Sequence, residues 1–202
     1  MSFKYKVIKK AISVELANFL FNYLKVKNDA VNYLYTNNLH EQSPILGSWS
    51  VDDQIPNTYA CYGDFAMETL LLKLIPIMKI NTGLNLIPTY SYARLYKKGD
   101  ELKRHKDRPS CEISTTLNLG GDRWDIFLEP SGKTNQNGTK IDLKQGDMLV
   151  YSGCELEHWR EPFEGQVCGQ VFLHYNNLDG KFKNENKYDG RPMLGLPSYT
   201  KK

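Results

Sequence analysis

The sequence predicts an α+β domain that is mainly β, with helices near the amino terminus followed by a run of short strands. A strong helical periodicity over residues 64–80 gives way, from about residue 86, to β-prone segments separated by glycine-containing turns. The 13 tyrosines and 8 phenylalanines also favour a sheet-rich fold. We expect the strands to form a sandwich or barrel with the helices packed outside it.

Two helices are expected before the strands begin. The first covers residues 14–25 with Ser13 as its N-cap, and its apolar positions have helical spacing: Leu16, Phe19, Leu20 and Tyr23. The second covers residues 64–80, ends at Gly83, and carries a longer apolar stripe: Met67, Leu70, Leu71, Leu74, Ile75 and Met78. Residues 28–62 have weak periodicity, which indicates a short helix and a long irregular surface.

At least six strands are expected in the second half of the chain. Their ranges are 89–96, 111–119, 123–130, 139–143, 147–153 and 169–175. In the first of them, alternation places Tyr90, Tyr92, Arg94 and Tyr96 on one face. We therefore predict a single domain over residues 1–202, with helical support over about 1–83, a β barrel over about 86–176 and a tail over about 177–202.

Composition excludes several classes of function. A net charge of +3 is too small to indicate a nucleic-acid partner. No apolar run approaches the roughly 20 residues of a membrane span, and the amino terminus lacks the apolar stretch of a secretory signal. The four cysteines form no CxxC pair. We expect a cytoplasmic protein with no membrane partner, and the sequence leaves its oligomeric state open.

The segment RHKDRP, residues 104–109, suggests a metal site. His105 and Asp107 are two residues apart, so on an extended backbone their side chains project to the same side. His158 follows a predicted strand and is the best third ligand, whereas His174 lies within a strand and His40 in the irregular region. Two imidazoles and one carboxylate are typical of non-haem Fe(II) oxygenases, in which three coordination positions stay open.

Other interpretations remain at this point. An HxD motif alone is weak, and a charged surface loop would also explain residues 104–109. Zinc is an alternative metal, because Cys154 and His158 form a Cys-x-x-x-His pair. That pair lacks the tight turn of a zinc knuckle, which favours iron.

From Tyr96 to His174 the chain resembles the 2-oxoglutarate/Fe(II)-dependent dioxygenase superfamily, and within it the prolyl 4-hydroxylase-like branch. The matching segments occur in order: YKKGDELKRHKD, TTLNL, LKQGDMLVYSG, HWREPFEG and QVFLHY. The resemblance implies a double-stranded β-helix, a jelly-roll barrel with the N-terminal helices outside. It also implies Fe(II) held by His105, Asp107 and His158, and 2-oxoglutarate as a cosubstrate converted to succinate and CO₂. Ascorbate would be an additional cofactor.

The same resemblance identifies candidate contacts for 2-oxoglutarate. A tyrosine nine or ten positions before the first iron ligand commonly contacts the cosubstrate, and Tyr96 fits this position, although plain core packing would explain it as well. The basic residue expected about ten positions after the distal histidine is replaced by Cys168. A buried carboxylate still needs a cation, so we predict that Arg160 binds it, with Arg94 as the alternative. A surface ion pair with Glu157, Glu161 or Glu164 is the competing explanation for Arg160.

The sequence therefore predicts an oxidoreductase that hydroxylates a substrate, with a prolyl or other side chain of a peptide as the first candidate. Hydroxylation of a small molecule or free amino acid is the alternative within catalysis. A non-catalytic jelly-roll module that only binds a ligand is the alternative outside it. The loops expected to select the substrate, about 37–62 and 130–138, carry no readable motif.

Overall fold

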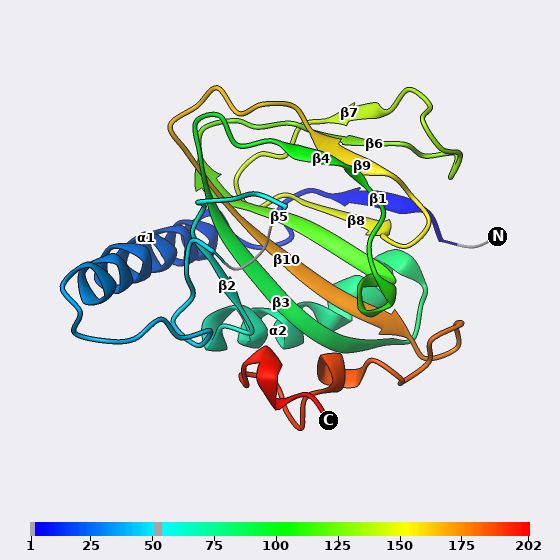
Figure 1. The fold of residues 1–202 in the computed structure, drawn as a ribbon. Coiled ribbons are helices and arrows are strands. Elements are labelled where there is room, and N and C mark those ends of the chain that lie inside the picture. The colour runs from blue at the N-terminus through cyan, green and yellow to red at the C-terminus, as the bar shows by residue number, and fades with distance from the viewer. Residues whose placement is uncertain (1–2, 51–53) are drawn as a thin grey trace.

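Two antiparallel sheets form the body of the protein, and both long helices cover the outer face of the larger sheet (Figure 1). The computed structural model describes residues 3–50 and 54–202, so part of the loop 37–62 lies outside the described residues. The larger sheet has the order β1 (Tyr5–Ile8), β8 (Met148–Ser152), β5 (Ile113–Gly121), β10 (Val167–Asn177), β3 (Leu86–Lys97) and β2 (Ala60–Tyr62). The smaller sheet has the order β4 (Leu102–His105), β9 (His158–Arg160), β6 (Ile126–Leu128) and β7 (Thr139–Ile141).

The first helix, α1 (Val14–Thr36), is longer than expected. Ser13 caps it as predicted, since its hydroxyl accepts a hydrogen bond from the Leu16 amide at 3.1 Å. The helix continues past residue 25 because the chain carries no glycine or proline there and keeps apolar residues facing the sheet. Its buried positions are Ala17, Leu20, Leu24 and Val31. Phe19, predicted to be on the buried stripe, is instead 64% exposed.

The second helix, α2 (Phe65–Thr82), agrees closely with the sequence prediction. Asp64 caps it by accepting hydrogen bonds from the amides of Ala66 and Met67, and Gly83 ends it in the left-handed conformation with φ of 72°. Of the predicted stripe, only Ile75 is not fully buried. No helix among the described residues is long and apolar enough to cross a membrane.

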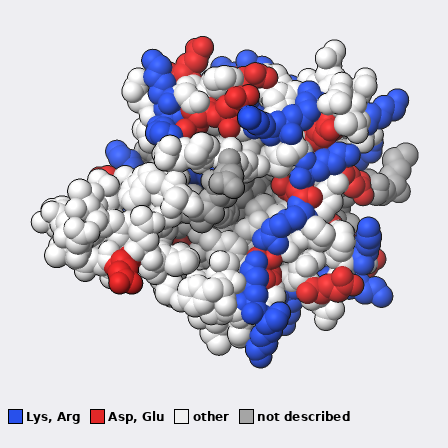
Figure 2. Space-filling model, viewed as in Figure 1, with Lys and Arg blue, Asp and Glu red and all other residues white. Residues whose placement is uncertain are grey.

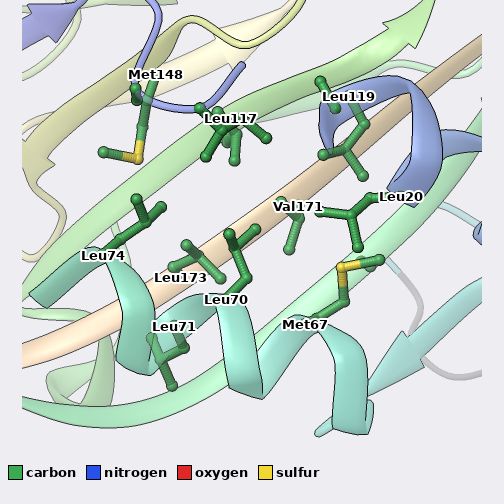
Figure 3. Close-up of a cluster of buried hydrophobic side chains, with 14 of the residues drawn as sticks. Leu20, Met67, Leu70, Leu71, Leu74, Leu117, Leu119, Met148, Val171 and Leu173 are labelled. Atoms are coloured by element: carbon green, nitrogen blue, oxygen red, sulfur yellow. The ribbon is translucent and has the colours of Figure 1, made fainter. Parts of the chain in front are cut away.

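The main hydrophobic core lies between these helices and the larger sheet (Figure 3). Met67, Leu70 and Leu74 of α2 meet side chains from the sheet, and Leu20 of α1 lies beside them. The sheet contributes alternate residues of its central strands: Leu117, Leu119, Met148, Val171 and Leu173. Burying the side chains of Leu, Val and Met stabilises the fold by about 1.5–3 kcal/mol each, so this layer carries the larger sheet.

The opposite face of the larger sheet, which points toward the smaller sheet, is polar although it is buried. Strand β5 turns Ser114 and Thr116 to this side, and β10 adds Gln170 and His174, all of them less than a tenth exposed. Protein interiors contain polar side chains in such number only where hydrogen bonds or a ligand satisfy them. The two faces of one sheet therefore divide the molecule into a structural core and a candidate binding site.

Four strands were not predicted, and two of them correct the expected layout. Residues 5–8, expected in the helical support, form the edge strand β1, with Tyr5 opposite Tyr151 of β8. Residues 60–62, in the expected irregular surface, form β2 against β3, with Cys61 opposite Ala93. The short strands β4 and β9 pair with each other. All four are three or four residues long, too short for a periodic signal in the sequence.

The C-terminal segment, residues 178–202, folds back against α2 and β3 through ion pairs, one of which is fully buried. Arg191 donates to Glu68 of α2 at 2.6 Å, and the exposed fractions of the two side chains are 0% and 3%. Asp189 accepts two hydrogen bonds from Arg108 and an ion pair from Lys201. Because Arg108 directly follows Asp107, these contacts connect the C-terminal segment to the loop that carries Asp107.

Candidate metal centre and cosubstrate pocket

His105, Asp107 and His158 converge although 51 residues separate Asp107 from His158. His105 ends β4 and lies directly opposite His158 in the pairing with β9. Their ring centroids are 4.2 Å apart. Asp107 follows β4 and is held by its amide, which donates to the carbonyl oxygen of Gly153 at 2.9 Å. Its Oδ1 atom lies 3.6 Å from Nε2 of His105 and 3.5 Å from Nε2 of His158.

The backbone orients both imidazoles toward this point. Nδ1 of His105 lies 2.8 Å from the carbonyl oxygen of Lys103, and Nδ1 of His158 lies 3.1 Å from that of Leu156. A carbonyl oxygen only accepts, so Nδ1 carries the proton in each ring and Nε2 presents a lone pair. Metal-binding histidines are commonly oriented in this way.

The ionised carboxylate of Asp107 gives the cluster a negative charge that suits a cation. Burial raises the pKa of Asp107, but the neighbouring imidazoles of His158 and His105 outweigh it and leave that pKa well below its usual range. Burial lowers the pKa of His105. The neighbouring Asp107 carboxylate raises it by more, so the net shift is upward. The three ligand atoms lie within 4.8 Å of one another. Two nitrogens and one ionised oxygen at this spacing fit a divalent metal of the iron type.

The zinc alternative through Cys154 is not supported by the geometry. Neither of the two groups of described residues that could hold a metal includes Cys154. Its thiol instead donates to the carbonyl oxygen of Arg108 at 3.3 Å. His158 therefore joins His105 and Asp107 rather than the nearby cysteine.

A cavity of about 280 Å³ lies between the two sheets and opens beside the three metal-ligand candidates. Its walls are mainly aromatic, from Tyr90, Tyr92, Tyr96, Tyr151 and Phe172. Arg94, Lys106 and Arg108 supply positive charge. The face shown in Figure 2 is hollowed near its centre, and lysine and arginine side chains follow one side of the hollow. A small anionic ligand would therefore fit this cavity in both size and charge.

Tyr96 lies in this wall, and it is 1% exposed. Burial raises its pKa, and the charges of Arg94 and Arg160 offset part of that rise. The hydroxyl therefore stays protonated near neutral pH and is a donor. Its ring packs edge-on against Trp124 at a centroid distance of 4.7 Å.

Arg160 is buried, which rules out the alternative explanation that it forms an ion pair on the surface. It is 1% exposed, and none of the ion pairs among the described residues joins it to Glu157, Glu161 or Glu164; Glu157 pairs with Arg104 instead. Burial lowers the pKa of Arg160. Its guanidinium donates to the carbonyl oxygen of Trp124 and, at 3.2 Å, to the hydroxyl of Thr116, while Nε has no hydrogen-bond partner among the described residues.

A buried cation with only neutral partners and an unsatisfied N–H favours an incoming anion. Thr116 connects this cation to Cys168, the position from which a basic residue was expected. Thr116 donates to Gln170 at 3.2 Å, and Gln170 donates to the thiol of Cys168 at 3.1 Å. The Arg160 charge on β9 thus lies in the same polar cluster as the substituted position on β10.

The two candidate arginines differ in their relation to the cavity. Arg94 is on the cavity wall, where it donates to the Tyr92 hydroxyl at 3.1 Å and lies over the rings of Tyr92 and Tyr96. Arg160 is not on that wall; its guanidinium lies over the ring of Trp124, with the centre of charge 4.9 Å from the ring centroid. A ligand reaching Arg160 would extend beyond the cavity toward Thr116.

Several residues at the site were missed by the sequence analysis. Tyr151 of β8 packs on the ring of His158 at 4.7 Å, and Phe172 and His174 of β10 line the cavity opposite Tyr92 and Tyr90 of β3. Tyr90 and Tyr92 were expected on this face from the alternation along residues 89–96. The others depend on strand register, for which the sequence carries no local signal.

No family model matches the sequence, and no curated protein matches it. Solved structures do. A prolyl-4-hydroxylase from Pseudomonas putida is 14% identical with a TM-score of 0.56, and the alignment covers 87% of this chain and 93% of that one. The non-haem alpha-ketoglutarate-dependent carbocyclase SnoK from nogalamycin biosynthesis is 12% identical with a TM-score of 0.63, covering 97% and 89%. HygX from Streptomyces hygroscopicus, with nickel, 2-oxoglutarate and hygromycin B bound, is 13% identical with a TM-score of 0.62, covering 87% and 84%.

The chain has the fold of 2-oxoglutarate-dependent oxygenases. These identities are low enough that the likeness concerns the fold alone. The chemistry has to be argued from the side chains of this protein.

Proposed function

We propose that this protein is an Fe(II)- and 2-oxoglutarate-dependent dioxygenase that hydroxylates a substrate and releases succinate and CO₂. The observation that carries the proposal is the convergence of His105, Asp107 and His158 beside a cavity between two sheets. The two sheets would be the halves of a double-stranded β-helix. The shared fold with SnoK, HygX and a prolyl-4-hydroxylase supports the same conclusion.

Iron would be held by Nε2 of His105, Nε2 of His158 and one oxygen of Asp107. Three protein ligands on one side of the ion leave the other positions for cosubstrate and O₂. When bound, Fe(II) would activate O₂ as the oxidant and 2-oxoglutarate would be oxidised together with the substrate, chemistry that no side chain of the protein provides. HygX, with nickel and 2-oxoglutarate bound, is a precedent for this pairing on the same fold.

The protein's own residues would bind and orient 2-oxoglutarate and would shield the reacting centre from water. Arg160 is the proposed partner of the 2-oxoglutarate 5-carboxylate, because its buried guanidinium keeps an unsatisfied N–H. Tyr96 would donate its hydroxyl to the same carboxylate. Tyr151 and Phe172 line the cavity with apolar surface, which excludes water from the reacting centre.

The substrate proposed first is a prolyl or other side chain of a peptide, as the prolyl 4-hydroxylase-like motifs suggest. A small molecule is the second candidate, favoured by the aromatic walls of a cavity of about 280 Å³. That volume lies just under the lower end of the range for drug-sized ligand sites, about 300 Å³. A module that binds ligand without turnover is the remaining alternative.

The proposed function is tested by anaerobic titration of the protein with Fe(II) and 2-oxoglutarate, followed by succinate release in air. The assay uses a panel of proline-containing peptides and small-molecule substrates, with and without ascorbate. We expect stoichiometric Fe(II) binding and iron-dependent succinate formation. Binding of 2-oxoglutarate without succinate release from any substrate would favour the binding module, and no metal binding at all would overturn the proposal.

A further inference from the structure

Asp107 faces the two histidines with only one of its carboxylate oxygens. Oδ1 is the atom near both imidazoles, at 3.6 and 3.5 Å. Oδ2 accepts a hydrogen bond from the hydroxyl of Ser114 at 2.6 Å. A carboxylate free to rotate could offer both oxygens to one ion, as acidic residues often do. Something in this chain therefore selects one oxygen.

The hydroxyl of Ser114 has one proton and three neighbours that compete for it. Oδ2 of Asp107 is the nearest at 2.6 Å, while the carbonyl oxygen of Cys111 and Nδ1 of His174 each lie at 3.0 Å. The short contact to an ionised oxygen is the strongest of the three, so the proton goes to Asp107. The hydroxyl then needs a donor of its own.

His174 supplies that donor. Nδ1 of His174 lies 3.0 Å from the Ser114 hydroxyl oxygen, and an imidazole nitrogen can either donate or accept a hydrogen bond. With the Ser114 proton committed to Asp107, the N–H must be on Nδ1 and donate to the hydroxyl oxygen. The ring is fixed from its other face by Tyr90, at a centroid distance of 4.5 Å. Hydrogen bonds thus run in one direction, from His174 through Ser114 to Asp107.

The backbone of Gly153 packs against Oδ2 of Asp107. A Cβ atom at this position would lie 2.4 Å from Oδ2 of Asp107, 2.4 Å from the carbonyl oxygen of Cys111 and 2.6 Å from the Ser114 hydroxyl. Real Cβ atoms essentially never approach that closely. The backbone of Gly153 therefore packs directly against the oxygen that Ser114 holds, and the carboxylate has little room to turn.

This arrangement also accounts for a second group of potential metal ligands. Atoms of Asp107, Cys111 and His174 lie within 4.8 Å of one another. The Ser114 hydroxyl already bridges Asp107 and His174, and the Tyr90 hydroxyl contacts the thiol of Cys111 at 3.0 Å. With these hydrogen bonds made, the group functions as support for Asp107 and not as a separate metal site.

We propose that Ser114 and His174 are positioning residues that hold Asp107 as a one-oxygen metal ligand. By keeping Oδ2 occupied, they leave open a coordination position that a two-oxygen carboxylate would take. The inference rests on the proposed function, because it assumes that a metal is bound by His105, Asp107 and His158. It adds a role for two buried polar residues that the ligand set alone does not explain.

The test is anaerobic binding of Co(II), a spectroscopic probe that reports coordination number, to the full chain and its Ser114→Ala variant. Partners that orient metal ligands typically change metal affinity by about 10–100-fold when removed. We expect a loss in that range, together with a changed visible spectrum of the bound Co(II). Ser91→Ala is the matched control, because Ser91 is also a buried serine of the larger sheet, but its hydroxyl has no hydrogen-bond partner in the part of the chain that the structure describes.

A second pair of variants separates the hydrogen bond from the bulk of the ring. His174→Asn keeps an N–H donor near the position of Nδ1 and should retain most of the Co(II) affinity, whereas His174→Leu should lose it. Wild-type affinity and spectrum in Ser114→Ala would overturn the inference, as would equal losses in Ser114→Ala and Ser91→Ala. If the unmodified chain binds no Co(II) or Fe(II), it is the proposed function that fails.

Discussion

His105 and His158 lie directly opposite each other where β4 pairs with β9, and this one register position brings the two imidazoles together. A shift of either strand by one residue would turn one ring to the other face of the sheet. The two strands have only four and three residues. Their alignment therefore relies on neighbours, among them Leu102, which is buried opposite Arg160.

Removing the imidazole of His158 should eliminate metal binding while leaving the fold intact. We expect His158→Ala to weaken Co(II) or Fe(II) binding by more than about 100-fold, beyond the loss typical of an outer partner. Iron-dependent 2-oxoglutarate turnover should disappear with it. Metal titration and succinate release measure the two effects, and the melting temperature of the apo protein reports on the fold.

His40 provides the control for that substitution. It is exposed and lies outside the site, with Nδ1 near the carbonyl oxygen of Glu41, so His40→Ala should behave as wild type. The ligand assignment would be wrong if His174→Ala abolished turnover and His158→Ala did not.

Features that depend on neighbouring residues were predictable from the sequence. The helix α2 was found with its cap and its buried stripe because N-caps, 3.6-residue periodicity and a C-terminal glycine are local signals. The shared face of Tyr90, Tyr92, Arg94 and Tyr96 followed from simple alternation, and all four line the cavity. The position of His158 at the end of a predicted strand was enough to nominate it over His174, which lies within one.

Features that depend on long-range pairing were not predictable. Strand β1 exists because Tyr5–Ile8 pairs with β8, some 140 residues later in the chain. Ser114 looked like an ordinary residue of a β strand, and only the fold brings it to Asp107 and His174. The burial of Arg160 likewise depends on Trp124 and Thr116, which are distant in sequence.

Adding a methyl group at Gly153 should disturb the metal centre more than the fold. The new Cβ atom in Gly153→Ala would meet Oδ2 of Asp107 at 2.4 Å, so the carboxylate must turn or move. We expect Co(II) affinity to fall by about 10-fold or more, the range found when a ligand's support is changed. Gly83→Ala is the comparison, since its Cβ atom meets nothing within 4 Å although its backbone is strained by a φ of 72°. Similar metal affinity in both variants would contradict this account.

The ion pair between Asp189 and Arg108 should make stability depend on pH. Burial raises the pKa of Asp189, but hydrogen bonds from Arg108 and Lys201 outweigh it and leave that pKa far below the unfolded value of about 3.9. The folded state therefore gains stability above pH 3.9 and loses it as the pH falls through the folded pKa. At pH 7 we expect Asp189→Asn to lower the free energy of unfolding by about 2 kcal/mol, less than for a fully buried pair because Arg108 is half exposed.

The free-energy difference between Asp189→Asn and wild type should shrink as the pH falls from about 3.9 toward the folded pKa, because the unfolded wild-type chain takes up a proton in this range and the folded protein does not. Urea unfolding at pH 7 and at lower pH measures it. Asp179→Asn, an exposed carboxylate of the same C-terminal segment, should show no such dependence. A loss in Asp189→Asn that is constant with pH would mean that the carboxylate charge is not what holds the segment.

The most specific expectation concerns Arg160 and 2-oxoglutarate. A charge-assisted pair in a buried pocket should contribute about 2–4 kcal/mol when it forms. Arg160→Ala should therefore raise the apparent KM for 2-oxoglutarate by roughly 30-fold or more, since every 1.4 kcal/mol is tenfold. Arg160→Lys should recover only part of the loss, because an ammonium group lacks the planar fork of donors. Metal affinity should barely change.

The burial of Arg160 also predicts the direction in which the melting temperature of the apo protein changes on substitution. A purely structural arginine would give the opposite direction. Its guanidinium has neutral partners and an Nε without any, so in the absence of cosubstrate the charge costs stability. Arg160→Met should then melt at the same or a higher temperature than wild type as apo protein, yet lose the stabilisation that 2-oxoglutarate and metal give to wild type. A structural arginine would instead destabilise the apo protein when replaced. Wild-type 2-oxoglutarate kinetics in Arg160→Ala would move the carboxylate to Arg94, whose guanidinium already lies on the cavity wall.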